Sequence, residues 1–279
     1  MKFADSALVR RFDIKRVRDG AAERVPDTVA NEEPLEIRLT YWVKDMRTTA
    51  SLAVAMRTPG NDRELAVGFL LTEGIIRQAR DLIEVRQMGT QPSGEVLAEV
   101  ARHVDVDEWR MARASFAGAS CGICGKRTRE ALAAEVPGSF QKGLTLDRHF
   151  IDRLPSSLRD RQPGFAETGG LHAAALINGR GEIEVMFEDI GRHNALDKLI
   201  GNSFLAGRES LDQYVIFLSS RSSFELVQKA AMAGCPILAT VGGPSSLAIE
   251  TARDYGLTLI GFVRDGRFNI YAGDWRINL

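Results

Sequence analysis

The sequence predicts an α/β protein in which a larger domain of alternating strands and helices follows a smaller α+β portion. In the second half, runs rich in Val, Ile and Phe alternate with helical stretches of about ten to fifteen residues. In the first half, strand patterns outnumber helical ones. With 279 residues and 44% hydrophobic content, the chain can bury a full core. We expect an arm at 1–33, the α+β portion at 34–145 and the α/β domain at 146–279.

The first portion is expected to begin with an arm, because residues 1–33 are rich in charge and end before Pro34. Asn61 followed by Glu64 has the pattern of a helix N-terminus, and the apolar residues beyond it predict a helix to about Ile76. Alternating apolar residues predict strands at 35–39, 50–56, 82–88 and 95–101.

The second portion should open with a helix at 147–161, which the Gln162-Pro163-Gly164 sequence is expected to break. Ser222 and Glu225 have the spacing of a capping box at a helix start. The other expected elements are helices at 192–204, 223–233 and 245–255, and strands at 183–187, 214–218, 237–241 and 258–263. Strands joined by helices imply crossover connections and a largely parallel or mixed sheet.

The charge balance excludes some function classes. The 36 Lys and Arg residues nearly match the 37 Asp and Glu residues, which disfavours a dedicated nucleic-acid binder. No apolar stretch is long enough to cross a bilayer, so we expect no membrane partner. The basic residues are 29 Arg and only 7 Lys, and the planar fork of Arg suits two-point contacts with phosphate.

Three cysteines are too few for a disulfide framework, so we expect a reducing, cytoplasmic setting. Cys121 and Cys124 form a C-x-x-C pair whose neighbours include two glycines and Lys126. Nearby positive charge and helix-terminus amides favour the thiolate, so this segment has the character of a reactive-sulfur site. Cys235 stands in an apolar stretch and is expected to be a small buried side chain.

The same pair is compatible with half of a zinc site or with a redox dithiol. Zinc needs two more ligands, but no second C-x-x-C exists, and His172, His193, Cys235 or a carboxylate would have to serve. A thioredoxin-like site is disfavoured because the segment before Cys121 is rich in Ala, Ser and Gly rather than being a buried strand. We therefore expect no metal, while a zinc-binding protein stays the alternative.

Polar loops follow several predicted strands, at 188–194, 219–223 and 242–246. Hydroxyls and free amides at such strand ends bind anions, and the carboxyl ends of parallel strands share one edge of a sheet. We expect one shared cleft there, close to Ser220 and Gly242. Because neither a P-loop nor a Rossmann glycine motif occurs, ordinary ATP hydrolysis and NAD binding are disfavoured.

Several of these segments together resemble the formate dehydrogenase accessory sulfurtransferases, the FdhD sulfur carriers. The matching segments, in chain order, are 56–62, 64–76, 120–126, 168–174, 188–198, 219–230 and 261–271. They are collinear from about residue 33 to residue 271, which makes a chance match implausible.

The resemblance implies a cytidine deaminase-like three-layer fold with a mixed sheet, a homodimer and a sulfur relay. A cysteine desulfurase would load sulfur on Cys121 as a persulfide, with Cys124 as the second cysteine of the loop. The sulfur would pass to the molybdenum or tungsten bis-guanine-dinucleotide cofactor of formate dehydrogenase.

The residues expected to hold that cofactor are Phe262, Val263, Arg264, Asp265, Gly266 and Arg267, with Ser220 and Gly242. Deaminase chemistry is not expected, because Ala173 and Ala174 follow His172 where a deaminase has Ala and Glu. A chaperone that binds the cofactor without transferring sulfur is a further alternative.

Overall fold

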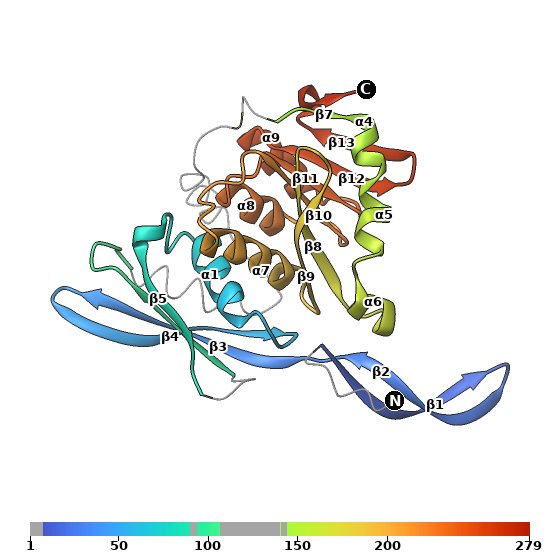
Figure 1. Cartoon of the computed structure of the whole chain (residues 1–279), viewed down its shortest axis with the longest axis horizontal. Helices are drawn as coiled ribbons and strands as arrows, with labels where there is room; N and C mark the ends of the chain where they lie inside the picture. The colour runs from blue at the N-terminus through green and yellow to red at the C-terminus, as the bar shows by residue number, and fades with distance from the viewer. Residues whose placement is uncertain (1–7, 90–93, 107–139, 141–143) are drawn as a thin grey trace.

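A six-stranded mixed sheet forms the centre of the protein (Figure 1). The computed structural model describes residues 8–89, 94–106, 140 and 144–279. The strands, in the spatial order β13-β12-β11-β10-β8-β9, are β8 (His172–Asn178), β9 (Ile183–Asp189), β10 (Tyr214–Leu218), β11 (Ile237–Thr240), β12 (Thr258–Arg264) and β13 (Arg267–Ala272). The three central strands β10, β11 and β12 run parallel, whereas β8 and β13 are antiparallel to their neighbours. The predicted α/β class and mixed sheet are confirmed, while the cytidine deaminase-like detail stays a prediction.

Helices cover both faces of this sheet. One face packs against α4 (Arg148–Asp152) and α5 (Leu154–Arg159), which α6 (Pro163–Thr168) follows. The other face packs against α7 (Arg192–Leu205), α8 (Phe224–Met232) and α9 (Ser246–Tyr255). Side chains of β10 alternate between the two cores, with Phe217 on the α5 side and Ile216 on the α8 side. No helix of the described ranges is long and apolar enough to span a membrane.

A second sheet lies beyond α7 (Figure 1). Its order is β4-β3-β6-β5, with β3 (Glu33–Val43), β4 (Met46–Arg57), β5 (Leu82–Gln87) and β6 (Glu95–Val100). The helix α1 (Asp62–Thr72) packs between this sheet and α7. One cluster of buried side chains runs from Leu35 through Leu70 to Leu199, so the two sheets share a core.

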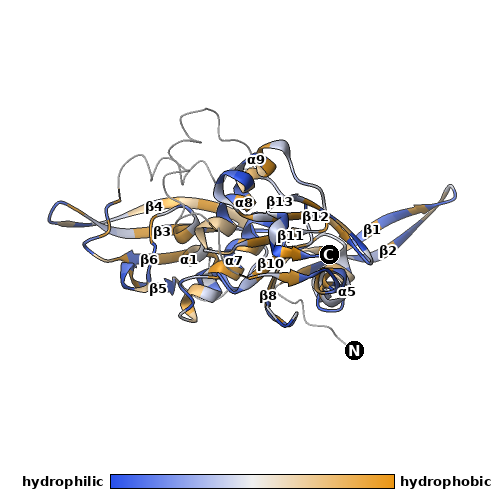
Figure 2. Cartoon of the chain, turned by 90° about the horizontal axis from the view of Figure 1, so that it is seen from above, coloured by the Kyte–Doolittle hydropathy of each residue, from blue (hydrophilic) through white to orange (hydrophobic). Residues whose placement is uncertain are grey.

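Residues before this sheet form an extended β-hairpin that projects from the body (Figures 1 and 2). It consists of β1 (Val9–Arg18) and β2 (Ala21–Ala30), joined at Asp19 and Gly20, which both have positive φ, as tight hairpin turns require. Most of its side chains are exposed. The short elements η1 (Ala79–Asp81), β7 (Leu146–Asp147), η2 (Asp274–Arg276) and β14 (Ile277–Asn278) complete the described fold.

Several predicted boundaries are wrong for local reasons. The first helix ends at Thr72 rather than Ile76, because Gly74 turns into the left-handed region. The helix expected at 147–161 is two helices. The predicted break before Pro163 is confirmed, since α5 ends at Arg159. Pro163 also begins α6, because proline in the first helical turn has no amide that needs a partner.

Two strands of the central sheet were not predicted. β8 contains three consecutive alanines, which alternation cannot distinguish from a helix, and it is a strand because helices cover both of its faces. β13 mixes polar and apolar residues at the sheet edge.

The crossing of α1 and α7 depends on two glycines. A Cβ atom built on Gly201 would overlap the carbonyl oxygen of Glu64, and one on Gly68 would overlap that of Asp197. The helices can approach this closely only because both positions lack a side chain.

We expect Gly201→Ala to destabilise the fold by about 3 kcal/mol or more, because neither backbone can retreat from the added methyl group. Urea denaturation measures this loss. Gly179→Ala is the control, since its Cβ would meet nothing nearer than a Leu144 methyl at 3.4 Å. Equal stability of the two variants would contradict the close crossing.

Candidate functional site

The ends of β10, β11 and β12 are joined by backbone hydrogen bonds at one edge of the central sheet. The amide of Gly242 donates to the carbonyl of Ser220 at 3.0 Å, and the amide of Phe262 donates to the carbonyl of Gly242 at 3.0 Å. Three residues expected to bind the cofactor therefore lie side by side. The Gly242 amide is already used in this network, and a Cβ there would come within 2.6 Å of Arg221, so its role is to allow close packing.

Phe262 presents an aromatic ring at this edge. Its backbone has φ 52°, which is unfavourable for a non-glycine residue, and its side chain is 45% exposed. The ring lies against Gly243, where an added Cβ would come within 2.6 Å of it. An aromatic surface held in a strained conformation at a sheet edge is suited to stacking with a planar ligand.

The turn between β12 and β13 contains the other expected residues. Arg264 donates from Nη1 to the carbonyl of Val241 at 2.6 Å, which anchors its side chain at the end of β11. Arg264, Asp265, Gly266 and Arg267 are exposed, and Gly266 has a positive φ of 75°. Val263 is fully buried in the core, so only its backbone can contact a ligand.

The first turns of α7 and α8 bring a histidine and a carboxylate together. His193 Nε2 lies 2.8 Å from Glu225 Oε2. This contact with His193 is the main cause that holds the pKa of Glu225 below its usual value. Burial, with the nearby Arg192 charge, lowers the pKa of His172 and so favours its neutral form.

The capping box predicted at Ser222–Glu225 is wrong. Ser223 is the N-cap of α8, but its side chain makes no capping hydrogen bond, and Glu225 contacts His193 instead. In the described structure the hydroxyls of Ser222 and Ser223 are buried without a hydrogen-bond partner. Asn61 likewise makes no side-chain cap, because its backbone is left-handed.

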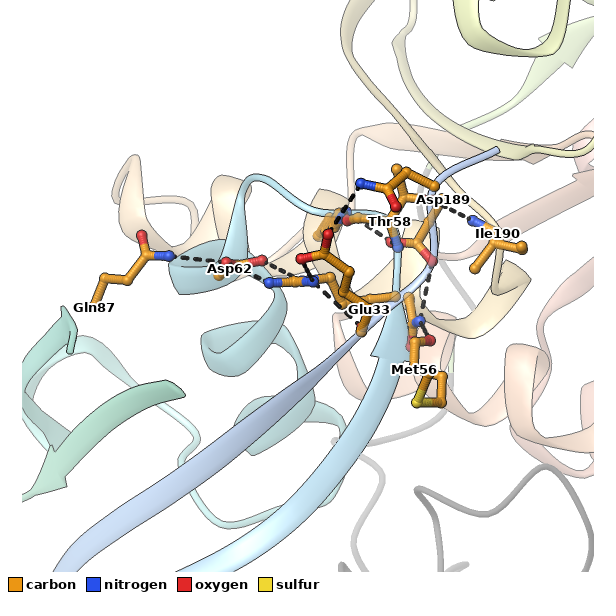
Figure 3. A network of polar contacts seen from close by, with 11 residues as sticks. Glu33, Met56, Thr58, Asp62, Gln87, Asp189 and Ile190 are labelled. Atoms are coloured by element: carbon orange, nitrogen blue, oxygen red, sulfur yellow. Dashed lines mark hydrogen bonds and ion pairs between the residues drawn. The ribbon is translucent and has the colours of Figure 1, made fainter. Parts of the chain in front are cut away.

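A buried polar network ties the two sheets together behind this edge (Figure 3). Asp189, the last residue of β9, accepts from the Thr58 amide at 3.2 Å and pairs with Lys198 at 2.7 Å. Lys198 also donates to the Thr58 carbonyl at 2.8 Å. Asn194 donates to the carbonyl of Met56 at 2.8 Å and to Asp189 at 3.0 Å. Both charged side chains of the pair are almost fully buried.

Two further buried pairs extend the network. Arg57 donates to both oxygens of Asp62, at 2.7 and 3.0 Å, and Gln87 donates to the same carboxylate at 2.9 Å (Figure 3). Lys229 of α8 donates to both oxygens of Asp197 at 2.9 Å. Sequence reasoning assigned no role to these residues. Only Asp197 lies in the segment 188–198, whose mixture of acidic and basic residues was a signal that sequence reasoning could have used.

Of the three cysteines, Cys235 lies among the residues that the structure describes. Cys121 and Cys124 lie outside the described residues. Cys235 is buried, as predicted, and burial raises the pKa of its thiol to about 12. Among the described residues, no three His, Cys, Asp or Glu side chains are grouped so that they could hold a metal ion.

We expect Lys198→Met to cost about 3–5 kcal/mol, because it leaves the Asp189 carboxylate buried without its partner. Adding Asp189→Asn to that variant should recover part of the loss, and urea denaturation of the single and double variants gives the coupling. A purely additive double variant would show that the pair does not act as a unit.

Glu225 should stabilise the protein in a pH-dependent way. Its pKa is lowered in the folded state, so its contribution is present above the ordinary value of 4.5 and is lost as the pH falls through the lowered value. The unfolding free energy of wild type should therefore exceed that of Glu225→Gln at neutral pH and converge with it in acid. Glu23→Gln on the exposed arm is the control, and a difference that persists unchanged at low pH would contradict this role.

Comparisons with known proteins agree with the collinear motifs. The FdhD/NarQ family model matches residues 30–278. The sulfur carrier protein FdhD of Streptomyces avermitilis is 41% identical over 98% of this chain and 96% of its own length. That of Saccharolobus solfataricus is 37% identical over 96% of this chain and 98% of its own length.

A solved structure shares the fold. The crystal structure of a protein from Desulfotalea psychrophila, assigned as a formate dehydrogenase accessory protein, superposes with a TM-score of 0.77 at 24% identity. The superposition covers 97% of this chain and 100% of the solved chain. With a family model that matches nearly the whole sequence and relatives of this identity, the chain belongs to the FdhD/NarQ family.

Proposed function

We propose that this protein is a sulfur carrier required for formate dehydrogenase activity. The observation that carries the proposal is the relatives at 37–41% identity over nearly the full chain, which are named sulfur carrier protein FdhD. The C-x-x-C pair of Cys121 and Cys124 supplies the sulfur chemistry that such a role needs.

In the proposed loading step, the Cys121 thiolate attacks the outer sulfur of a persulfide on a cysteine desulfurase. The sulfur–sulfur bond of the donor breaks, its cysteine leaves as a thiolate, and the sulfane sulfur is now bonded to Cys121. No external oxidant or reductant is needed. Lys126 and Arg127 follow the pair in sequence and favour the thiolate form. Cys124 is the second thiol of the same C-x-x-C pair.

The proposed acceptor is the molybdenum or tungsten bis-guanine-dinucleotide cofactor, bound as cargo. The exposed ring of Phe262 offers a stacking surface for a base. Arg264 uses Nη1 to anchor itself, which leaves its other nitrogens for phosphate, and Arg267 follows three residues later on the exposed turn. Ser220 and Gly242 shape the edge rather than contact the cargo through side chains.

Loading is tested by incubating the full chain with a cysteine desulfurase and cysteine, then weighing its peptides by mass spectrometry. We expect the peptide with Cys121 to gain about 32 Da, the mass of one persulfide sulfur. Cys121→Ala should abolish the gain on that residue and fail to restore formate dehydrogenase activity. Cys235→Ala, which removes a buried thiol, should load normally.

A cofactor-binding chaperone predicts no mass gain on the wild-type protein, and activity that survives Cys121→Ala. A zinc-binding protein predicts stoichiometric metal that the Cys121→Ala variant loses. Either result would overturn the sulfur-carrier proposal.

A further inference from the structure

Arg276, in the short helix η2, is a buried cation that the proposed function does not use. Only 1% of its surface is exposed. Its Nη1 donates to the carbonyl of Gly256 at 2.9 Å and to Oγ1 of Thr258 at 3.0 Å, and both acceptors are uncharged. Thr258 is the first residue of β12, so Arg276 lies at the end of this strand opposite the β12–β13 turn. It is therefore separate from the groups proposed to hold the cargo.

The other two nitrogens of Arg276, Nε and Nη2, are buried and have no hydrogen-bond partner in the described structure. They are the two donors on one edge of the guanidinium group, and such an edge fits two oxygens of one anion. The same edge of Arg57 holds both oxygens of Asp62, at 2.7 and 3.0 Å. That of Arg47 holds both oxygens of Glu99, at 2.9 and 2.5 Å. Arg276 thus presents, in the interior, a donor pair that elsewhere in this chain binds a carboxylate.

No described group within hydrogen-bond distance offsets the charge of Arg276. Burial lowers the pKa of Arg276, but a guanidinium group stays protonated at neutral pH. The thiol of Cys235 is close enough to interact with it, yet burial raises the pKa of that thiol to about 12, so the thiol is neutral. A buried charge with unpaired donors is strongly destabilising, and native proteins rarely leave such groups without a partner.

We infer that the Nε and Nη2 edge of Arg276 binds a small carboxylate ion. The single negative charge of a carboxylate balances the single charge of the guanidinium group. Phosphate carries more than one charge at pH 7 and would leave negative charge buried. The inference does not depend on the sulfur-carrier role, and it assigns the protein a second ligand, held away from the cargo.

The segment that carries Arg276 offers a small ion a way in. β14, which follows η2, pairs with β7 over two residues only. The Trp275 ring centroid lies 5.2 Å from the Arg276 guanidinium carbon, and Trp275 is 57% exposed. Local opening of a segment with so few contacts needs little free energy. The carboxylate of a folded partner could not reach an edge buried in this way, whereas a small ion can be enclosed with it.

The test is urea unfolding of the full chain, dialysed free of carboxylate, with added formate or acetate and with chloride keeping the ionic strength constant. Above the dissociation constant, the folding equilibrium constant of wild type should rise about tenfold for every tenfold rise in carboxylate. Arg276→Lys keeps the charge but loses the paired donors, so its equilibrium constant should not respond. Arg80→Lys, in the exposed helix η1, is the matched control and should respond as wild type does.

Arg276→Met is the second variant, because an apolar side chain in place of a buried charge does not leave donors unpaired. It should fold and should not respond to formate or acetate. A wild-type protein that shows no carboxylate dependence would overturn the inference, as would an equal response of Arg276→Met. A response to phosphate as large as that to carboxylate, present in wild type and absent from Arg276→Met, would show that the assigned class of anion is wrong.

Discussion

The buried pair of Asp189 and Lys198 is the constraint on which the arrangement of the two sheets depends. Their side chains are 0% and 2% exposed, and each also bonds the backbone of Thr58. A charge left unpaired at that depth would cost several kcal/mol. If the segment after β4 moved away from β9 and α7, both buried charges would lose their hydrogen bonds to Thr58. These contacts therefore fix the position of the second sheet beside the first.

Paired side chains of α7 and α8 place exposed groups near the sheet edge. On α7, His193 and Asp197 are one turn apart, and on α8 their partners Glu225 and Lys229 are also one turn apart. The inner pair is buried and the outer pair is partly exposed. Two ion pairs thus join α7 to α8, one in the core and one near the sheet edge. His193 is therefore positioned by a helix with buried contacts rather than by a loop.

The sequence allows much of this fold to be predicted, but little of the network. β10, β11 and β12 are identifiable as apolar runs, and their shared carboxyl edge correctly brings Ser220, Gly242 and Phe262 together. β8 was missed because its alanines carry no alternation. The pairing of Asp189 with Thr58 could not be inferred, since it joins residues far apart in sequence and depends on a tertiary contact that no local pattern encodes.

The turn between β12 and β13 has three features that work against folding stability. Arg264 and Arg267 are direct cross-strand partners, and like charges at such positions repel each other. In the same segment Phe262 has a strained backbone, and the register shifts between Gly261 and Arg264. Each of these features works against folding stability when the turn is considered alone. A phosphate bound to both guanidinium groups would offset this repulsion. Relief of the repulsion would then contribute to the binding free energy of the anion.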